Sequence, residues 1–288
     1  MIKKVKYLLP AEDINMGGIV VKQALPTNKV DQLDPFLLLH HANFTFNNYA
    51  PASQQGIGPH PHRGFTPVTF LINGELRHQD SRGHNQVARK GEVQWMHAGA
   101  GIIHSERPTQ ALIDSNQAQE LIQLWINSPA DKKMQQPRYQ FIKEEEIPFF
   151  ISGDQRIKNK LIAGNYQELQ GKIQTESDLL IIWSKTDKPS SQTLQIPTSF
   201  NTMLYLIQGT IRIKGYGKVE SKNLVIFENN ATDINLSTES RAEFLVLSGV
   251  PLNEKTVQHG PFVMNTQTQI MEALRDYQMG KMGILIED

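Results

Sequence analysis

The stretch VTFLINGELR, residues 68–77, reads as a strand, a tight turn at Gly74 and a second strand. Later in the chain MLYLIQGTIR, residues 203–212, repeats the pattern with Gly209 aligned on Gly74. The segment ELIQLWINSP after the first copy likewise resembles EFLVLSGVP after the second. This self-similarity predicts two copies of one β-fold. The alternative is that any two β-hairpins look somewhat alike.

The rest of the chain supports a fold built from β-strands. Runs of strand length, rich in β-branched and aromatic residues, are separated by Gly, Asn, Pro or charged clusters. Examples are GEVQWMHA (91–98), LLIIWSK (179–185) and NLVIFEN (223–229). Regular spacing of this kind favours sandwiches and barrels over a βαβ fold. We therefore expect an all-β protein.

One segment near the end of the chain has helical periodicity. Ile270, Leu274 and Tyr277 fall at i, i+4 and i+7, on one face of a helix. Asn265 or Thr266 is a suitable N-cap, and glycines follow the periodic segment. We expect a helix over residues 266–280 that packs its apolar face on β-structure.

Composition excludes several classes of function. The 288 residues include 29 basic and 29 acidic ones, so the formal net charge is zero. This balance argues against a broad surface for nucleic acid or anionic lipid, and we expect no direct nucleic-acid binding. The absence of cysteine excludes thiolate nucleophiles and cysteine-based metal sites.

The apolar runs are short. The first ends at Pro10, which is too early for the core of a signal peptide. No stretch approaches the roughly 20 apolar residues that a membrane helix needs. We therefore expect a cytoplasmic protein with no membrane partner.

Two pairs of polar residues have the spacing of metal ligands on strands. His60 and His62 lie at i and i+2, so their side chains share one face of a strand. His104 and Glu106 have the same spacing on a second strand. If these strands are neighbours, the four side chains converge. Spacing alone also allows ordinary hydrogen-bonded histidines.

Three neutral imidazoles and one carboxylate suit a divalent transition metal. In an octahedral ion two positions would stay open, which indicates catalysis or ligand capture because structural zinc sites are normally closed. In the second copy, Gln195 and Pro197 align with His60 and His62. We expect one metal, in the N-terminal half.

Other side chains near these pairs carry separate expectations. His78 and His84 flank QDSRG, a predicted turn, and we expect both to be solvated. His97 is a candidate to support a metal ligand. Continued alternation from His60 and His62 would point Thr66, Val68, Phe70 and Ile72 inward, with Ile102 joining them from the second strand, provided that no bulge interrupts the strand near Gly64.

The chain resembles the pirins, which are bicupins, over nearly its full length. The motifs that carry the resemblance are DPFLLL (34–39), HPHRGF (60–65), GEVQWMHAGAGIIHSE (91–106), LIQLWIN (121–127), RYQ with EEIP (138–148) and VQHGPFVMNTQTQI (257–270).

The resemblance implies two cupin β-barrels (double-stranded β-helices) that face each other, followed by the C-terminal helix. We expect an N-terminal metal-binding domain over residues 1–137. A C-terminal domain without metal ligands, which includes the helix, follows over 138–288. The metal ligands of pirins fall on four residues of this chain: His60, His62, His104 and Glu106.

The resemblance also implies an activity. Several pirins resemble quercetin 2,3-dioxygenases, so we expect metal-dependent cleavage of flavonols such as quercetin with O2. Fe(II) is the expected metal, and Ni, Zn, Cu, Mn or Co are alternatives. Glu106 would be both ligand and catalytic proton acceptor, since one carboxylate oxygen stays free.

Two rival functions belong to other classes. The first is a non-enzymatic, iron-dependent regulator that senses redox state and binds protein partners. The second is a sugar isomerase, which would need basic residues at the metal to hold phosphate. Only Arg63 and Arg107 lie near the ligands, and alternation turns both to the opposite face.

The chain departs from the usual pirin pattern at two places. Thr66 stands where HPHRGF is normally followed by an acidic residue, and His40 and His41 replace an acidic pair after DPFLLL. None of these is a predicted ligand. We expect them to alter the charge of the pocket or its entrance.

Overall fold

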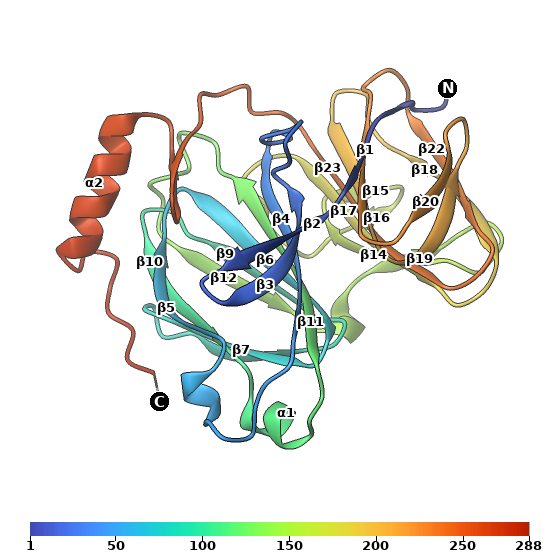
Figure 1. Cartoon of the computed structure of the whole chain (residues 1–288). Coiled ribbons are helices and arrows are strands. Elements are labelled where there is room, and N and C mark those ends of the chain that lie inside the picture. The colour runs from blue at the N-terminus through green and yellow to red at the C-terminus, as the bar shows by residue number, and fades with distance from the viewer. Residues whose placement is uncertain (288) are drawn as a thin grey trace. The chain divides into compact units, whose positions relative to one another are not determined.

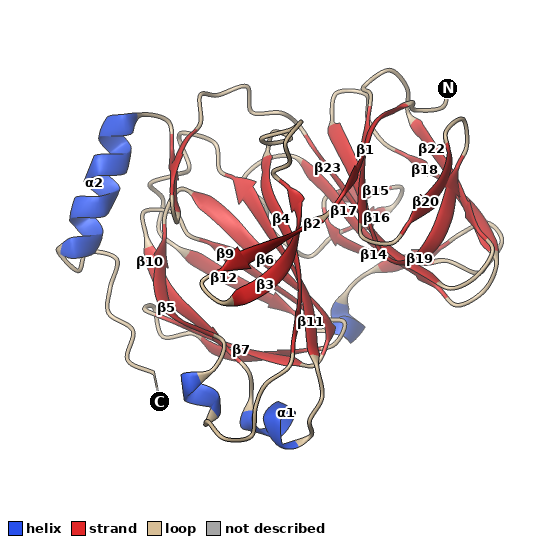
Figure 2. Ribbon diagram, in the orientation of Figure 1, coloured by secondary structure: helices blue, strands red, loops and turns tan. Residues whose placement is uncertain are grey.

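The computed structural model describes residues 1–287 as an assembly of short strands with little helix (Figure 1). Figure 2 shows that helix is confined to α2 and a few short segments. The expected all-β class and the two cupin-type β-domains are confirmed.

The chain forms two compact units. The first unit joins Met1–Pro35 to Glu146–Leu252. The second joins Phe36–Glu145 to the stretch from Asn253 onward. We expected the chain to divide once, between residues 137 and 138. In the structure, each compact unit instead combines a segment from the N-terminal half with one from the C-terminal half. The four residues expected to bind metal all belong to the second unit.

The strands of the first unit are β1 (Val5–Pro10), β2 (Glu12–Met16), β3 (Ile19–Leu25), β13 (Phe149–Ile151), β14 (Lys158–Ala163), β15 (Asn165–Tyr166), β16 (Leu169–Gln170), β17 (Leu179–Thr186), β18 (Ser190–Gln195), β19 (Asn201–Ile213), β20 (Gly217–Glu220), β21 (Asn223–Phe227), β22 (Asp233–Thr238) and β23 (Ala242–Gly249).

The elements of the second unit are β4 (Phe36–Phe44), η1 (Ala52–Gln54), β5 (Ile57–His62), β6 (Phe65–Asn73), β7 (Glu75–Asp80), β8 (Asn85–Arg89), β9 (Val93–His97), β10 (Ile102–Arg107), α1 (Gln110–Asp114), β11 (Gln119–Asn127), β12 (Arg138–Ile142), β24 (Val257–His259), β25 (Phe262–Met264) and α2 (Gln267–Gln278). A short 3-10 helix, η2 (Glu144–Glu146), lies at the boundary between the units.

The interior of the first unit is apolar. Its main sheet runs in the order β1-β21-β19-β23-β17-β14-β13, and β18 pairs with β22. Leucine, isoleucine, valine and phenylalanine side chains from these strands form one buried cluster, among them Leu194, Leu204 and Phe244. Gln195 and Pro197, which align with the two histidines of the first copy, are exposed. The positions that align with His60 and His62 therefore lie at the surface of this β-domain.

Two sheets position the site in the second unit. One has the order β5-β10-β7-β8, and the other contains β12-β9-β6-β11-β4. The chain passes from the first sheet to the second between β5 and β6, at Arg63 and Gly64. Gly64 has a φ of +85°, and a Cβ there would lie 2.0 Å from the carbonyl oxygen of Val263. Only glycine fits this turn without a shift of the backbone.

The C-terminal helix is confirmed with slightly narrower bounds. Thr266 caps α2 in a capping box with Gln269. Ile270 and Ala273 are fully buried in a cluster with Phe262 of β25, and Leu274 packs against this cluster. Tyr277 is more peripheral than expected, with 39% of its surface exposed. The helix therefore packs by its predicted face on β24 and β25, in the unit that contains the histidines.

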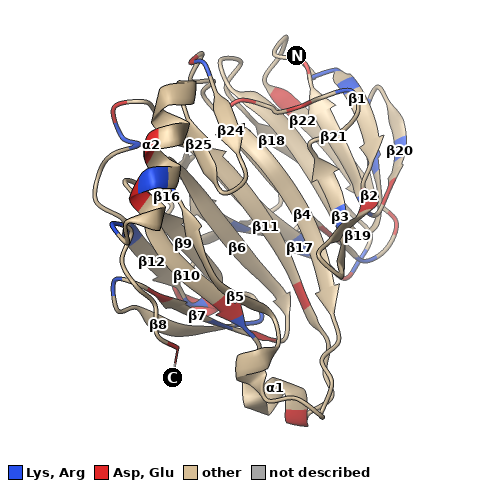
Figure 3. Cartoon of the chain, turned by 60° about the vertical axis from the view of Figure 1, so that its left-hand side comes forward, with Lys and Arg blue, Asp and Glu red and all other residues tan. Residues whose placement is uncertain are grey.

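The surface carries charges of both signs. In the view of Figure 3, basic and acidic positions are interspersed, including along α2. Among residues 1–287, no helix has the length and apolar character that crossing a bilayer would require.

Candidate metal centre

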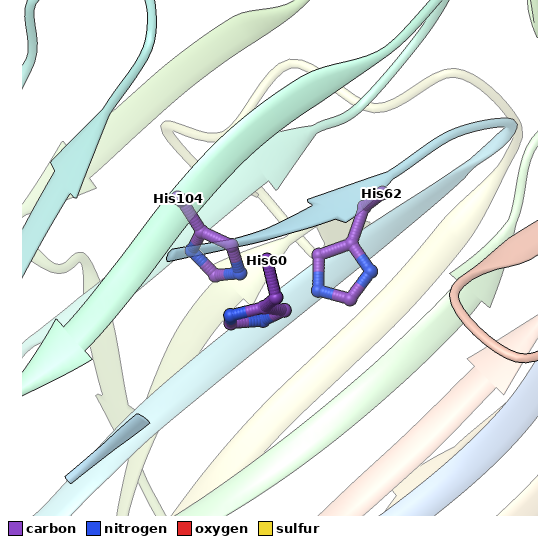
Figure 4. Close-up of side chains that lie close together, drawn as sticks. All are labelled: His60, His62 and His104. Atoms are coloured by element: carbon purple, nitrogen blue, oxygen red, sulfur yellow. The ribbon is translucent and has the colours of Figure 1, made fainter. Parts of the chain in front are cut away.

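Three histidines meet between two neighbouring strands. β5 and β10 are antiparallel, with His104 opposite His60 and Ile102 opposite His62. One ring nitrogen from each of the three histidines lies within 4.8 Å of the others (Figure 4). His62 and His104 are buried, and His60 is half-buried. The predicted convergence of the two strands is confirmed for these three side chains.

The nitrogens of the cluster are free to face one another. His60 Nδ1 lies 2.8 Å from the carbonyl oxygen of Gly58, which leaves Nε2 for the cluster. His104 Nδ1 lies 3.3 Å from His78 Nδ1, and His104 Nε2 has no hydrogen-bond partner among the described residues although it is buried. A buried nitrogen without a partner is costly, and a metal ion would satisfy it. The donor set fits a divalent transition metal.

Burial keeps these imidazoles neutral. It lowers the pKa of His60, and it lowers the pKa of His62 and of His104 well below the usual range. The neighbouring imidazoles lower the pKa of each ring further, because like charges would repel. Neutral imidazole is the form that binds metal.

Glu106 lies outside the group of three ligand atoms in this structure. The pairing of β5 with β10 shifts register between His104 and Glu106, so Glu106 comes opposite Ile57. Its Oε1 is 3.5 Å from Thr69 Oγ1, a hydroxyl that donates to Gln123 Oε1 at 2.9 Å. Burial raises the pKa of Glu106 to about 7, while the Thr69 contact opposes this.

The residues of β6 that face the site are not the expected ones. Thr69 contacts Glu106, so the alternate set that includes Thr66, Val68, Phe70 and Ile72 points the other way. Thr66 Oγ1 instead lies 3.3 Å from His97 Nδ1. The expectation was wrong because β5 and β6 belong to different sheets and Gly64 turns the chain between them.

Polar residues form a row across β6, β11 and β4, on the face that carries Thr69. Thr69 of β6 lies opposite Gln123 of β11, and Gln123 lies opposite His40 of β4. Residues paired in this way project to the same face. Burial lowers the pKa of His40 to about 4, so this imidazole is neutral. His41 projects to the other face and lies 2.8 Å from Glu120. Of the two histidines that depart from the pirin pattern, only His40 shares the face of Thr69.

Aromatic rings flank the histidines on the same side. The ring of His62 lies 5.1 Å from Phe65 and 5.4 Å from Trp125, both edge-on. These contacts fix the imidazole of His62 in place and make this side of the cluster apolar.

His78 is not solvated, contrary to expectation. Its β7 strand lies in the sheet beside β10, and only 2% of the residue is exposed. The ring stacks on Tyr139 at 4.3 Å and its Nε2 lies 3.1 Å from Asp80 Oδ2. His84 is partly exposed, at 41% of its side chain. The turn was placed correctly, but β7 continues into the sheet and buries His78.

The comparisons with known proteins decide the family. The pirin family model matches residues 18–126, and the model of the pirin C-terminal cupin domain matches 184–283. The chain belongs to the pirin family. It is 35% identical to Pirin-1 of Arabidopsis thaliana, over 98% of this chain and 94% of that protein.

Solved structures agree. A quercetin 2,3-dioxygenase from Acinetobacter baumannii matches 99% of this chain and 100% of its own, with a TM-score of 0.91 and 34% identity. A bacterial pirin from Escherichia coli in complex with nickel(II) has a TM-score of 0.68 at 20% identity, over 85% of this chain and 99% of that one. The second match bears on the fold alone.

Both arginines near the ligands are engaged elsewhere. Arg63 donates to the carbonyl oxygen of Ala100 at 2.6 Å and to Asp276 at 3.1 Å. Arg107 forms a bidentate pair with Glu287, with distances of 2.9 and 2.8 Å. These contacts disfavour the sugar isomerase, which would need a free cation beside the metal.

Proposed function

We propose that this pirin is a metal-dependent dioxygenase that cleaves flavonols such as quercetin with O2. Three residues, His60, His62 and His104, would hold Fe(II), with Ni, Zn, Cu, Mn or Co as alternatives. A divalent metal supplies Lewis acidity, which lowers the pKa of the flavonol hydroxyl and favours its anion. The observation that carries the proposal is the cluster of three neutral imidazoles, two of them buried and one half-buried, with the buried Glu106 two residues after His104 on β10.

Glu106 has two roles in this proposal. It completes the ligand set as the fourth ligand, and it takes the proton of the flavonol hydroxyl. Burial raises the pKa of this carboxyl to about 7 in the metal-free protein. When one carboxylate oxygen binds the metal, the other is left to accept the proton. Thr69 Oγ1 lies 3.5 Å from the carboxyl.

The surrounding side chains favour an aromatic substrate. Phe65 and Trp125 form an apolar wall beside His62. A flat ring with one ionisable hydroxyl can lie against such a wall while the hydroxyl faces Glu106. The neutral His40 and Gln123 add hydrogen-bonding groups on the same face of the sheet as Trp125.

The Glu106→Gln variant tests the role of the carboxyl. The amide keeps an oxygen donor and nearly the same volume but cannot accept the hydroxyl proton. Oxygen uptake with quercetin should fall by about a hundredfold or more, the usual loss for a general base. Metal content is measured on the same samples, so that a missing ion is not mistaken for lost chemistry.

Two outcomes would contradict the proposal. A metal-loaded Glu106→Gln protein that turns over at the wild-type rate would remove the proton-accepting role. A wild-type protein that consumes no oxygen with any flavonol, whichever metal is loaded, would favour the iron-dependent regulator that binds protein partners.

A further inference from the structure

A chain of hydrogen bonds runs from the metal-facing histidine of β10 into β7. His104 Nδ1 lies 3.3 Å from His78 Nδ1, and His78 Nε2 lies 3.1 Å from Asp80 Oδ2. His78 and Asp80 occupy positions i and i+2 of β7, opposite Glu106 and His104 of β10. The side chain of Asp80 is fully buried.

Each group in the chain is held from several sides. The ring of His78 stacks on Tyr139 with an interplanar angle of 15°. Asp80 Oδ1 accepts hydrogen bonds from the backbone nitrogens of Arg82 and His84, at 2.8 and 3.1 Å. His84 Nδ1 lies 2.8 Å from Asp80 Oδ2. The carboxylate therefore has a fixed position and can impose an orientation on His78.

When His78 and His104 are both neutral, these hydrogen bonds permit one proton arrangement. Asp80 accepts from His78, so the His78 proton lies on Nε2 and its Nδ1 carries a lone pair. That lone pair accepts from His104, so the His104 proton lies on Nδ1. His104 Nε2, which has no partner among the described residues, is left with a lone pair facing the other two histidines.

We propose that His78 and Asp80 are positioning residues that fix the tautomer and orientation of His104 for metal binding. Metal-binding histidines commonly donate their second ring N–H to a carboxylate or carbonyl group. Here the carboxylate acts through an intervening imidazole. The inference rests on the three-histidine metal site proposed above and not on flavonol cleavage.

The tautomers can be observed without metal. Long-range ¹H–¹⁵N NMR of the metal-free, histidine-labelled protein should show the His104 proton on Nδ1 and the His78 proton on Nε2. The Asp80→Asn variant should alter this pattern, because an amide NH₂ facing His78 would compete with its N–H. A wild-type His104 protonated on Nε2 would overturn the proposal.

Metal affinity gives the second readout. The Asp80→Asn and His78→Phe variants should raise the dissociation constant for Co²⁺ by about 10–100-fold in competition with a chelator. Phenylalanine can keep the stack on Tyr139 but cannot accept from His104, so it covers the case in which Asp80→Asn does not fold. The matched control is His84→Gln, which alters a contact to Asp80 and leaves His78 in place; its effect should be about twofold or less.

A merely structural role would appear differently. It would lower the melting temperature of the metal-free variants without changing the Co²⁺ affinity of the folded fraction, and this result would overturn the proposal. A wild type that binds no Co²⁺ would count against the metal site itself. The NMR pattern, measured without metal, would still decide whether His78 and Asp80 fix the His104 tautomer.

Discussion

His104 lies directly opposite His60 across the β5–β10 pair, with ring centroids 4.3 Å apart. The backbone pairing of two strands thus brings two of the three imidazoles together before any metal is present. His62 reaches the same point from the next inward position of β5, at 4.9 Å from His104. We expect the site to bind metal with little rearrangement.

The first prediction is that one divalent metal binds per chain. A His62→Ala protein should lose most of its metal, because two imidazoles and a protonatable carboxyl are a poor donor set. Metal analysis after dialysis against Fe²⁺ or Co²⁺ measures the occupancy. The control is His259→Ala, an exposed histidine on β24. Full occupancy in His62→Ala would show that the ion binds elsewhere.

The second prediction concerns the stability of the metal-free protein. Burial raises the pKa of Glu106 to about 7 in the folded state, above its ordinary value of 4.5. A group with a raised folded pKa stabilises the protein fully below pH 4.5 and loses that contribution as pH rises through 7. The stability of wild type relative to Glu106→Gln should therefore fall by about 3 kcal/mol between pH 4.5 and 8, from about 1.36 kcal/mol per pKa unit.

Urea unfolding of both chelator-treated proteins across this range gives the difference. The buried histidines act with the opposite sign, since their lowered pKa values cost stability as pH falls. They are present in both proteins, so the comparison cancels most of their effect. A difference that does not vary with pH would show that Glu106 titrates normally.

The third prediction tests the turn between the two sheets. Gly64 and Gly83 have similar φ values, +85° and +90°, but a Cβ at Gly83 would meet nothing within 4 Å. Gly83→Ala should cost only the left-handed backbone penalty, about 1–2 kcal/mol. Gly64→Ala also forces a Cβ against the Val263 carbonyl, so we expect a loss of about 4 kcal/mol or more. Equal losses in urea unfolding would mean that the close approach at Gly64 is easily relieved.

Much of the fold was predictable from local pattern. The β-runs and the apolar face of α2 are local features, and the structure contains them. The tight turns predicted at Gly74 and Gly209 were wrong: β6 and β7, on either side of Gly74, belong to different sheets, and Gly209 lies inside the continuous strand β19. A glycine with positive φ bends the chain at both places without turning it back. The shared face of His60 and His62 was also predictable, since i and i+2 residues share a face whatever the register of the neighbouring strand. His104 joins them because β10 pairs with β5, which spacing alone left as a condition.

The rest depended on how distant strands pair. The register shift in the β5–β10 pair and the change of sheet at Gly64 are set by tertiary packing. The first places Glu106 opposite Ile57, and the second changes which face of β6 points toward the histidines. His78 was expected to be solvated because a turn follows it, although its i, i+2 relation to Asp80 was visible in the sequence. Gln123 and Trp125 gave no signal, because alternation alone does not show which face of β11 points to the histidines.

The most direct test of the proposed activity measures O2 and carbon monoxide in one reaction, because the proposed ring cleavage releases one carbon of the flavonol as carbon monoxide. Wild-type protein loaded with Fe(II) is mixed with quercetin in a closed vessel, and dissolved O2 and released carbon monoxide are followed together. The account predicts one O2 consumed and one carbon monoxide released for each quercetin cleaved, with neither change in the His62→Ala protein. Oxygen uptake without carbon monoxide, or equal rates in the two proteins, would contradict it.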